Sequence, residues 1–138
     1  GMVRVDRYTV VDDFGNLINP MLAEGQVHGG VGQGIGQALT EHVVYDADGQ
    51  LLTATFMDYA IPRADNVPMI GFTSEPVPST ANPMGMKGCG EAGTVGALAA
   101  ISNAVQDAVW ERGNRQVDMP FTPARIWELL RDEPIAAE

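Results

Sequence analysis

The sequence has a single cysteine, few positive charges and no long hydrophobic run. One cysteine excludes an internal disulfide framework and a cysteine-rich metal site. Only 8 Lys and Arg residues stand against 18 Asp and Glu residues, a net charge of −10. We therefore expect neither a nucleic acid nor an anionic membrane surface as a partner, since both would repel this chain. The longest apolar stretch, residues 95–101, is far too short to span a bilayer.

The composition that remains is typical of a folded domain. Of the 138 residues, 45% are hydrophobic and 19% are charged, which is the balance of globular and not of disordered proteins. This length is enough for one hydrophobic core, so we expect residues 2–138 to form a single domain, with Gly1 treated as a remnant of tag removal. The first residues do not resemble a signal peptide, and we expect a cytoplasmic protein.

Local patterns predict strands and helices without a regular alternation. Alternating or apolar segments bounded by turn residues predict strands at residues 3–11, 42–45, 50–59 and 69–74, with a tight turn joining the middle two. Helical periodicity and capping residues predict helices at residues 21–41 and 94–110 and from Thr122 onward. We therefore predict an α+β fold with antiparallel strands, two long helices and a short C-terminal helix.

Sixteen glycines are the most unusual feature, and the first glycine cluster lies in the predicted helix 21–41. Val27, Val31, Ile35 and Leu39 recur there at every fourth position and form one apolar stripe. Each of the six glycines in this helix costs about 1 kcal/mol relative to alanine. Such a cost is offset when the missing Cβ atoms let another backbone, or a flat ligand, come close.

Three glutamines, Gln26, Gln33 and Gln37, lie on one side of the same predicted helix. Their amide groups can form a hydrogen-bonding wall for a ligand rich in heteroatoms. Equally, they can face solvent while the glycines pack against a second helix. The spacing does not decide between these two interpretations.

The second glycine cluster precedes the predicted helix 94–110. Gly88, Gly90 and Gly93 match the dinucleotide-binding fingerprint literally, but no buried strand precedes them, so the match is weak. Glu91 lies where this loop meets the helix. Its carboxylate either satisfies the helix dipole or is delivered into a pocket, where it can act as a general base.

Cysteine and histidine add little to this pattern. Cys89 lies beside Glu91, and a thiol near a helix start can be reactive, but no histidine partner is identifiable. His28 and His42 are 14 residues apart and lack metal-ligand spacing. We expect a structural role for His28 and no metal ligands among the side chains.

Both clusters together resemble a known family. The motifs are Gly25-Gln26-Val27-His28-Gly29-Gly30 with Gln33-Gly34-Ile35-Gly36, and Lys87-Gly88-Cys89-Gly90-Glu91-Ala92-Gly93. They resemble the C-terminal part of the molybdopterin-binding large subunit of molybdenum hydroxylases, which include xanthine dehydrogenase, aldehyde oxidase and aerobic carbon monoxide dehydrogenase. Residues 56–64 and 118–127 resemble the carbon monoxide dehydrogenase branch most. The resemblance runs in order over nearly the whole chain but covers only the last part of a much longer subunit.

The resemblance implies a role for each motif residue. Glu91 matches the general base in the oxidative hydroxylation of a small carbon substrate. Gln26 matches the glutamine that hydrogen-bonds the pterin cofactor, and Gly88, Cys89 and Gly90 match the loop backbone beside it. The implied cofactor is molybdenum–molybdopterin, in its cytosine dinucleotide form, whose own groups hold the metal.

The resemblance also implies partners, because this chain matches only part of such an enzyme. They are the remainder of the molybdopterin subunit, an iron–sulfur subunit and an FAD subunit, and we expect the chain to be inactive alone. Apolar surface left uncovered on the helix 21–41 predicts self-association. The alternatives are a non-catalytic assembly module without cofactor and, less favoured, a nucleotide-binding domain.

Overall fold

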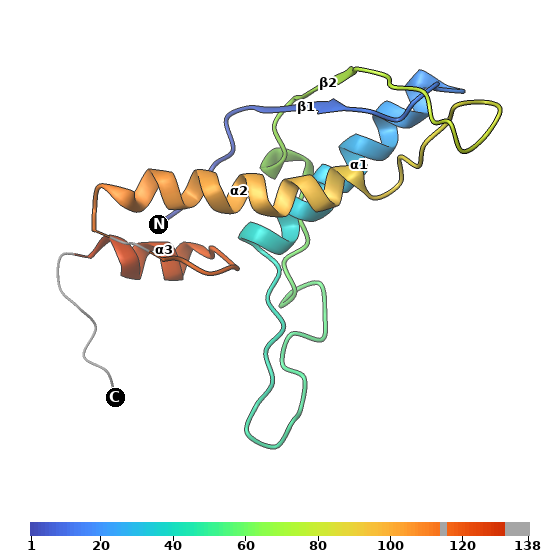
Figure 1. Ribbon diagram of the computed structural model, residues 1–138. Helices are drawn as coiled ribbons and strands as arrows, with labels where there is room; N and C mark the ends of the chain where they lie inside the picture. Colours follow the sequence, from blue (N-terminus) through green and yellow to red (C-terminus); the bar gives the residue numbers. More distant parts are fainter. Residues whose placement is uncertain (114–115, 132–138) are drawn as a thin grey trace.

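A computed structural model describes residues 1–113 and 116–131 of the chain. Figure 1 shows two long crossing helices, with a pair of strands over one end and a short helix near the other. The elements, in chain order, are β1 (Tyr8–Asp12), α1 (Pro20–Leu39), the 3₁₀ turn η1 (Ala64–Asn66), β2 (Ile70–Ser74), α2 (Ala92–Trp110) and α3 (Pro123–Leu130). The predicted α+β class is confirmed. In the described part of the chain, neither long helix is apolar enough to cross a membrane.

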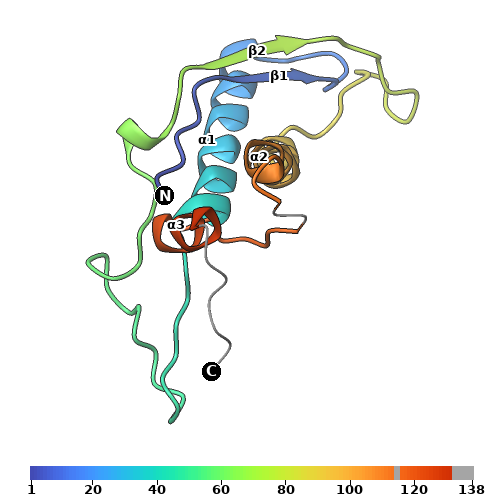
Figure 2. The ribbon, with the colours of Figure 1, turned by 90° about the vertical axis from the view of Figure 1, so that its left-hand side faces the viewer.

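The two strands pair in parallel, so the predicted antiparallel arrangement is wrong. Tyr8 lies opposite Ile70, and the register continues to Asp12 opposite Ser74. Parallel strands need a crossover connection, and here the long segment between β1 and β2, which contains α1, supplies it (Figure 2). Sequence periodicity predicted the strands themselves but carried no information on their direction.

The predicted hairpin at residues 42–45 and 50–59 is also absent as a pair of strands. Its turn does form, but the two limbs share only an isolated bridge between Tyr45 and Leu51. A two-stranded hairpin is marginal in water unless one face packs on something else. Most residues of both limbs are exposed in this structure, so the alternating pattern has no core to cover.

The helices follow the predicted boundaries closely because their signals are local. The side chain of Asn19 accepts a hydrogen bond from the backbone N–H of Leu22, and Pro20 occupies the first turn of α1. Thr122 caps α3 in the same way. The apolar stripe of α1 is buried as predicted, and it packs with residues of α2 and α3 in one core: Val27, Val31, Ile35, Leu39, Ala97, Ile101, Val105 and Ile126.

Glycines let the two long helices approach until their backbones nearly touch. A Cβ atom on Gly34 would lie 2.4 Å from the Cβ of Ala97, and one on Gly93 would lie 2.5 Å from the carbonyl oxygen of Val27. A Cβ on Gly30 would lie 2.8 Å from the backbone nitrogen of Thr94. These distances exclude any side chain unless the helices move apart, so part of the first glycine cluster serves helix packing.

We predict that alanine at Gly34 destabilises the fold, whereas alanine at Gly32 does not. The new methyl group at position 34 would overlap Ala97, and overpacking of this kind costs about 1–3 kcal/mol. Gly32 lies in the same helix with nothing within 4 Å of an added Cβ, so Gly32→Ala should gain up to about 1 kcal/mol in helix propensity. Urea denaturation of both variants measures the difference; equal stabilities would contradict the close contact.

Candidate functional site

One side of α1 is bare, and nothing in residues 1–113 and 116–131 covers it. An added Cβ on Gly25, Gly29 or Gly32 would meet nothing within 4 Å. Gln26 and Gln33 are both exposed along the same helix. Packing within the chain therefore accounts for Gly30 and Gly34 but not for these three glycines. The packing interpretation is confirmed for Gly30 and Gly34, and the ligand interpretation of the other glycines stays a prediction.

The loop that leads into α2 is equally open. Gly88 and Gly90 have nothing within 4 Å of an added Cβ, and both are exposed. Glu91 occupies the N-cap position of α2, is exposed, and makes no capping hydrogen bond with its side chain. The first backbone N–H groups of a helix have no partners within the helix. The carboxylate of Glu91 makes no hydrogen bond to these groups, and both of its predicted roles, partner of the helix dipole or general base, stay predictions.

The helix crossing brings the two glycine clusters together. Gly93 at the start of α2 lies against the backbone of Val27 and Val31. The hydroxyl of Thr94 donates a hydrogen bond to the carbonyl oxygen of Gly30 at 3.1 Å and lies 3.4 Å from the side-chain oxygen of Gln33. The first turn of α2 therefore touches the glutamine side of α1. Gln26 and Glu91 come from the two segments that meet at this crossing.

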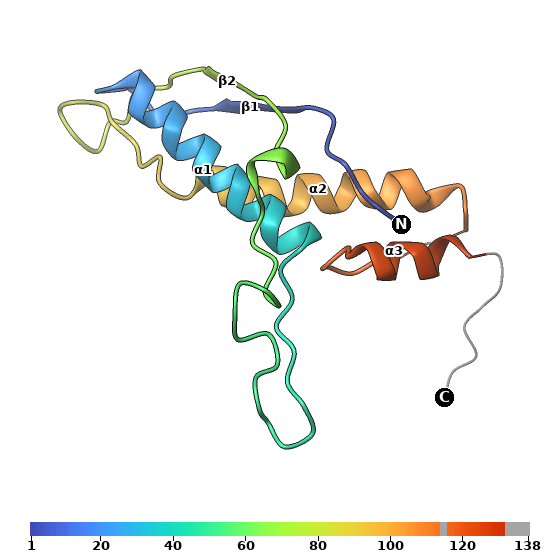
Figure 3. The same cartoon turned by 180° about the vertical axis from the view of Figure 1, so that it is seen from behind.

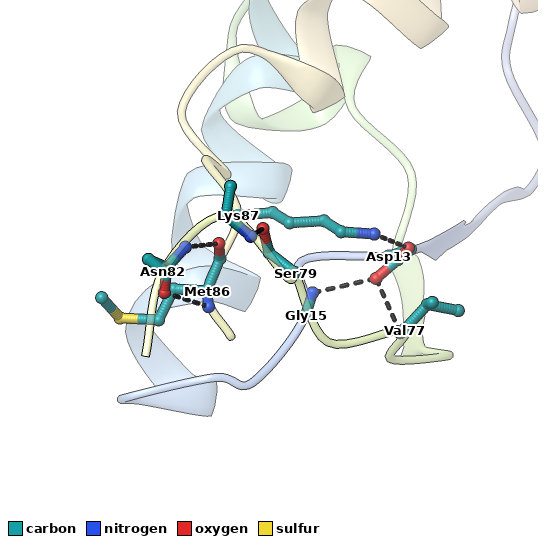
Figure 4. Close-up of polar contacts among 8 residues, drawn as sticks. Asp13, Gly15, Val77, Ser79, Asn82, Met86 and Lys87 are labelled. Carbon is teal, nitrogen blue, oxygen red and sulfur yellow. Dashed lines mark hydrogen bonds and ion pairs between the residues drawn. The ribbon is translucent and has the colours of Figure 1, made fainter. Parts of the chain in front are cut away.

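A second contact, which the sequence did not reveal, fixes the other end of the loop (Figure 4). Asp13, just after β1, accepts hydrogen bonds from the backbone N–H groups of Gly15 and Val77, each at 2.9 Å, and forms an ion pair with Lys87. These contacts lower the pKa of Asp13 to about 2. The hydrogen bond from Lys87 is the largest cause, and the hydrogen bonds from the two backbone N–H groups come next. The carboxylate is therefore held in its charged form.

Backbone hydrogen bonds reinforce this junction. The N–H of Lys87 donates to the carbonyl oxygen of Phe14 at 2.9 Å, and the N–H of Asn16 donates to that of Gly85 at 3.0 Å. Asn82 both donates to and accepts from the backbone of Met86. The loop is thus tied to the end of β1 up to Lys87, and the exposed Gly88 follows directly.

Cys89 and His28 lie near the crossing without forming a reactive pair. Cys89 is half-buried and packs against the hydrophobic core. His28 lies 3.7 Å from Glu24 on the next turn of α1. Among residues 1–113 and 116–131, no group of three His, Cys, Asp or Glu side chains is placed to hold a metal ion. The loop also follows residues 75–87 rather than a strand, so the dinucleotide fingerprint lacks its structural context.

We predict that Asp13→Asn loosens the loop that carries Glu91. Because the pKa of Asp13 is lowered to about 2 from 3.8, its contribution to stability is complete above about pH 4 and is lost as the pH falls toward 2. The variant should melt at a lower temperature at neutral pH, lose this pH dependence, and exchange the amide hydrogens of Gly88 and Gly90 faster.

Asp6→Asn is the matched control for this measurement. Asp6 has an ion pair with Arg4 at 3.8 Å, in which both side chains are highly exposed, and such pairs contribute little. If both variants melted and exchanged alike, Asp13 would have no special role in holding the loop.

Comparison with known proteins identifies the family. The profile of the molybdopterin cofactor-binding domain matches residues 1–68. The chain is 38% identical, over 99% of its length, to the carbon monoxide dehydrogenase large chain of Hydrogenophaga pseudoflava, and it covers 17% of that protein. It is 41% identical, over 91% of its length, to the nicotine 6-hydroxylase large subunit of Paenarthrobacter nicotinovorans, and it covers 15% of that protein.

Solved structures agree with the sequence matches. The crystal structure of quinoline 2-oxidoreductase from Pseudomonas putida 86 superposes with a TM-score of 0.90 at 44% identity, over 95% of this chain and 17% of that one. The chain thus spans about one-sixth of the length of the relatives it matches and is similar to one segment of each. On this evidence, it belongs to the molybdopterin cofactor-binding domain family of the molybdenum hydroxylases.

Proposed function

We propose that this chain supplies one wall of the cofactor site and the general base of a molybdenum hydroxylase. Glu91 is the proposed base, and Gln26 is the proposed hydrogen-bonding partner of the pterin. The observation that carries the proposal is the crossing of α1 and α2. The uncovered side of α1, the exposed glycine loop and the Glu91 carboxylate, which makes no capping hydrogen bond, belong to this one region.

The residues present fit a flat cofactor rich in heteroatoms. Gly25, Gly29 and Gly32 leave α1 open, at a cost of about 1 kcal/mol each that no contact among the described residues explains. The amide of Gln26 and the backbone of residues 88–90 supply hydrogen-bond donors and acceptors. We propose the cytosine dinucleotide form of molybdopterin, because the motifs resemble those of enzymes in that branch.

Glu91 is suited to accept a proton. Its carboxylate is exposed and makes no capping hydrogen bond, and its backbone lies between the loop tied at Lys87 and the closely packed first turn of α2. The molybdenum–pterin group, when bound, supplies the two-electron oxidation. The chain's own part is to orient the substrate-facing carboxylate and to bind the pterin along α1.

The remaining parts of the enzyme must come from elsewhere. Because the chain spans about one-sixth of its relatives, we propose that the rest of a molybdopterin subunit completes the site and sets substrate choice. Iron–sulfur and FAD subunits are the proposed path for electrons. We propose a cytoplasmic location and no activity for these 138 residues alone.

We predict that Glu91→Gln abolishes turnover in the assembled, cofactor-loaded enzyme while leaving its molybdenum content unchanged. The amide keeps the size of the side chain but cannot accept the proton, and loss of general-base catalysis costs about 10²–10⁴-fold. Glu111→Gln, an exposed glutamate at the other end of α2, is the control and should keep full activity. Full turnover in Glu91→Gln would leave a non-catalytic assembly module as the better account.

We predict that Gly29→Leu lowers the molybdenum content of the assembled enzyme. The side chain would extend from the bare side of α1, where nothing in the described part of the chain lies near the Cβ position, so the isolated chain should fold as before. Ala124→Leu adds similar bulk to an exposed position of α3 and should leave the molybdenum content unchanged. Metal analysis of both purified complexes provides the measurement, and full loading of Gly29→Leu would argue against a cofactor on this side of α1.

A further inference from the structure

Residues 41–61 form an arm that projects from the body of the molecule. Figures 1 and 3 show it hanging away from the helices, between the end of α1 and η1. Its large apolar side chains are mostly exposed: Val43, Tyr45, Leu52, Phe56, Met57 and Ile61. Phe56 is 81% and Met57 93% exposed. A cluster of this kind on a soluble domain marks an interaction surface.

The arm has a defined shape at its tip. The carboxylate of Asp46 accepts hydrogen bonds from the backbone N–H groups of Asp48 and Gln50, at 3.0 and 2.8 Å. Gly49 takes a positive φ of 80°, which completes the turn. The N–H of Leu52 donates to the carbonyl oxygen of Val44 at 2.8 Å and joins the two limbs.

The base of the arm is clamped to α1. The backbone N–H of Glu41 donates to the carbonyl oxygen of Gly36 at 2.8 Å, and the hydroxyl of Tyr59 donates to the carboxylate of Glu41. Phe56 and Tyr59 contribute to the wall of a hollow of about 370 Å³ at this base. An arm already ordered in this way loses less conformational entropy when it binds.

We propose that this arm docks onto the part of a molybdopterin subunit that the relatives contain and this chain does not span, with Phe56 and Met57 as its anchors. Burying each of these side chains contributes about 1.5–3 kcal/mol, which the chain by itself does not gain. The proposal rests on the proposed assembly with that remainder but not on any role of Glu91.

The match to quinoline 2-oxidoreductase supports this occupant. Because the TM-score is 0.90 over 95% of the chain, we infer that the matching residues of that protein follow nearly the same course as this arm. That protein is about six times longer than the matched segment. That protein therefore contains both the matching arm and a large remaining part of its chain, against which the arm can pack.

Charge disfavours a second copy of this chain as the occupant. Residues 41–61 contain four acidic residues and neither lysine nor arginine, and the whole chain carries a net charge of −10. Two copies would bring like charges together. We expect the receiving surface to be an apolar pocket with lysine or arginine at its rim.

The test is methionine oxidation by hydrogen peroxide, read by peptide mass spectrometry. Met57 in the arm and Met69 outside it are matched, at 93% and 92% exposed, so in the isolated chain they should oxidise at similar rates. In a chimera, this chain replaces the aligned 136 residues of the Hydrogenophaga pseudoflava large chain. There Met57 should oxidise roughly tenfold more slowly than in the isolated chain, because docking removes it from solvent.

Unchanged oxidation of Met57 in the chimera would overturn the proposal. So would protection of Met57 in the isolated chain that grows with concentration, since a second copy would then be the occupant. If the chimera does not fold, residues 41–61 are exchanged for the relative's counterpart. Recovery of folding then supports the proposal, because it shows that the mismatch lies in the arm. Continued failure to fold counts against the proposal.

Met57→Asp separates docking from folding. The isolated variant should keep the melting temperature of the unmodified chain, because this side chain contributes nothing to the core. In the chimera it should lower the yield of folded protein at least severalfold, and an unchanged yield would contradict the anchor role. Because neither readout needs cofactor or turnover, the result is independent of the test of Glu91.

Discussion

The backbone contact between α1 and α2 is the constraint on which the rest of the structure depends. It exists only because Gly30, Gly34 and Gly93 have no side chains. The apolar stripe of α1 packs into the core on one side of this contact. The side of α1 that carries the glutamines therefore lies along the other edge of the contact. The geometry of the candidate site is thus a consequence of how closely two helices pack.

The glycines divide into groups with different physical roles. Gly30, Gly34 and Gly93 permit close packing, whereas Gly25, Gly29 and Gly32 leave an uncovered helix side. Between the tether at Lys87 and the first turn of α2, the loop backbone at Gly88 and Gly90 is bare in the same way. Under the proposed function, a cofactor bound against this open side accounts for glycines that weaken their own helix.

Sequence reasoning succeeded where the signals are local. Helical periodicity, the cap at Asn19 and the turn residues fixed the helices to within about two residues, the usual uncertainty of such boundaries. It failed on the direction of strand pairing, which a long connection decides. It also failed on residues 50–59, where alternation lacks a core to cover.

The candidate site was only partly visible from the sequence. The two glycine clusters were visible from composition, and the structure shows that the helix crossing brings them together. The ion pair between Asp13 and Lys87 joins residues 74 positions apart, and no local pattern signals such a contact. The Asp-rich turn after β1 was recognised as a turn, but its role as an anchor for the loop depends on the tertiary fold. The functions assigned to Glu91 and Gln26 stay predictions.

A crystal structure of the assembled, cofactor-loaded enzyme containing this chain would test the account most directly. The account predicts electron density for the pterin along the bare side of α1, within contact distance of Gly29 and Gln26, with the carboxylate of Glu91 facing the metal end. Polypeptide packed over Gly25, Gly29 and Gly32, with the cofactor bound elsewhere, would contradict it.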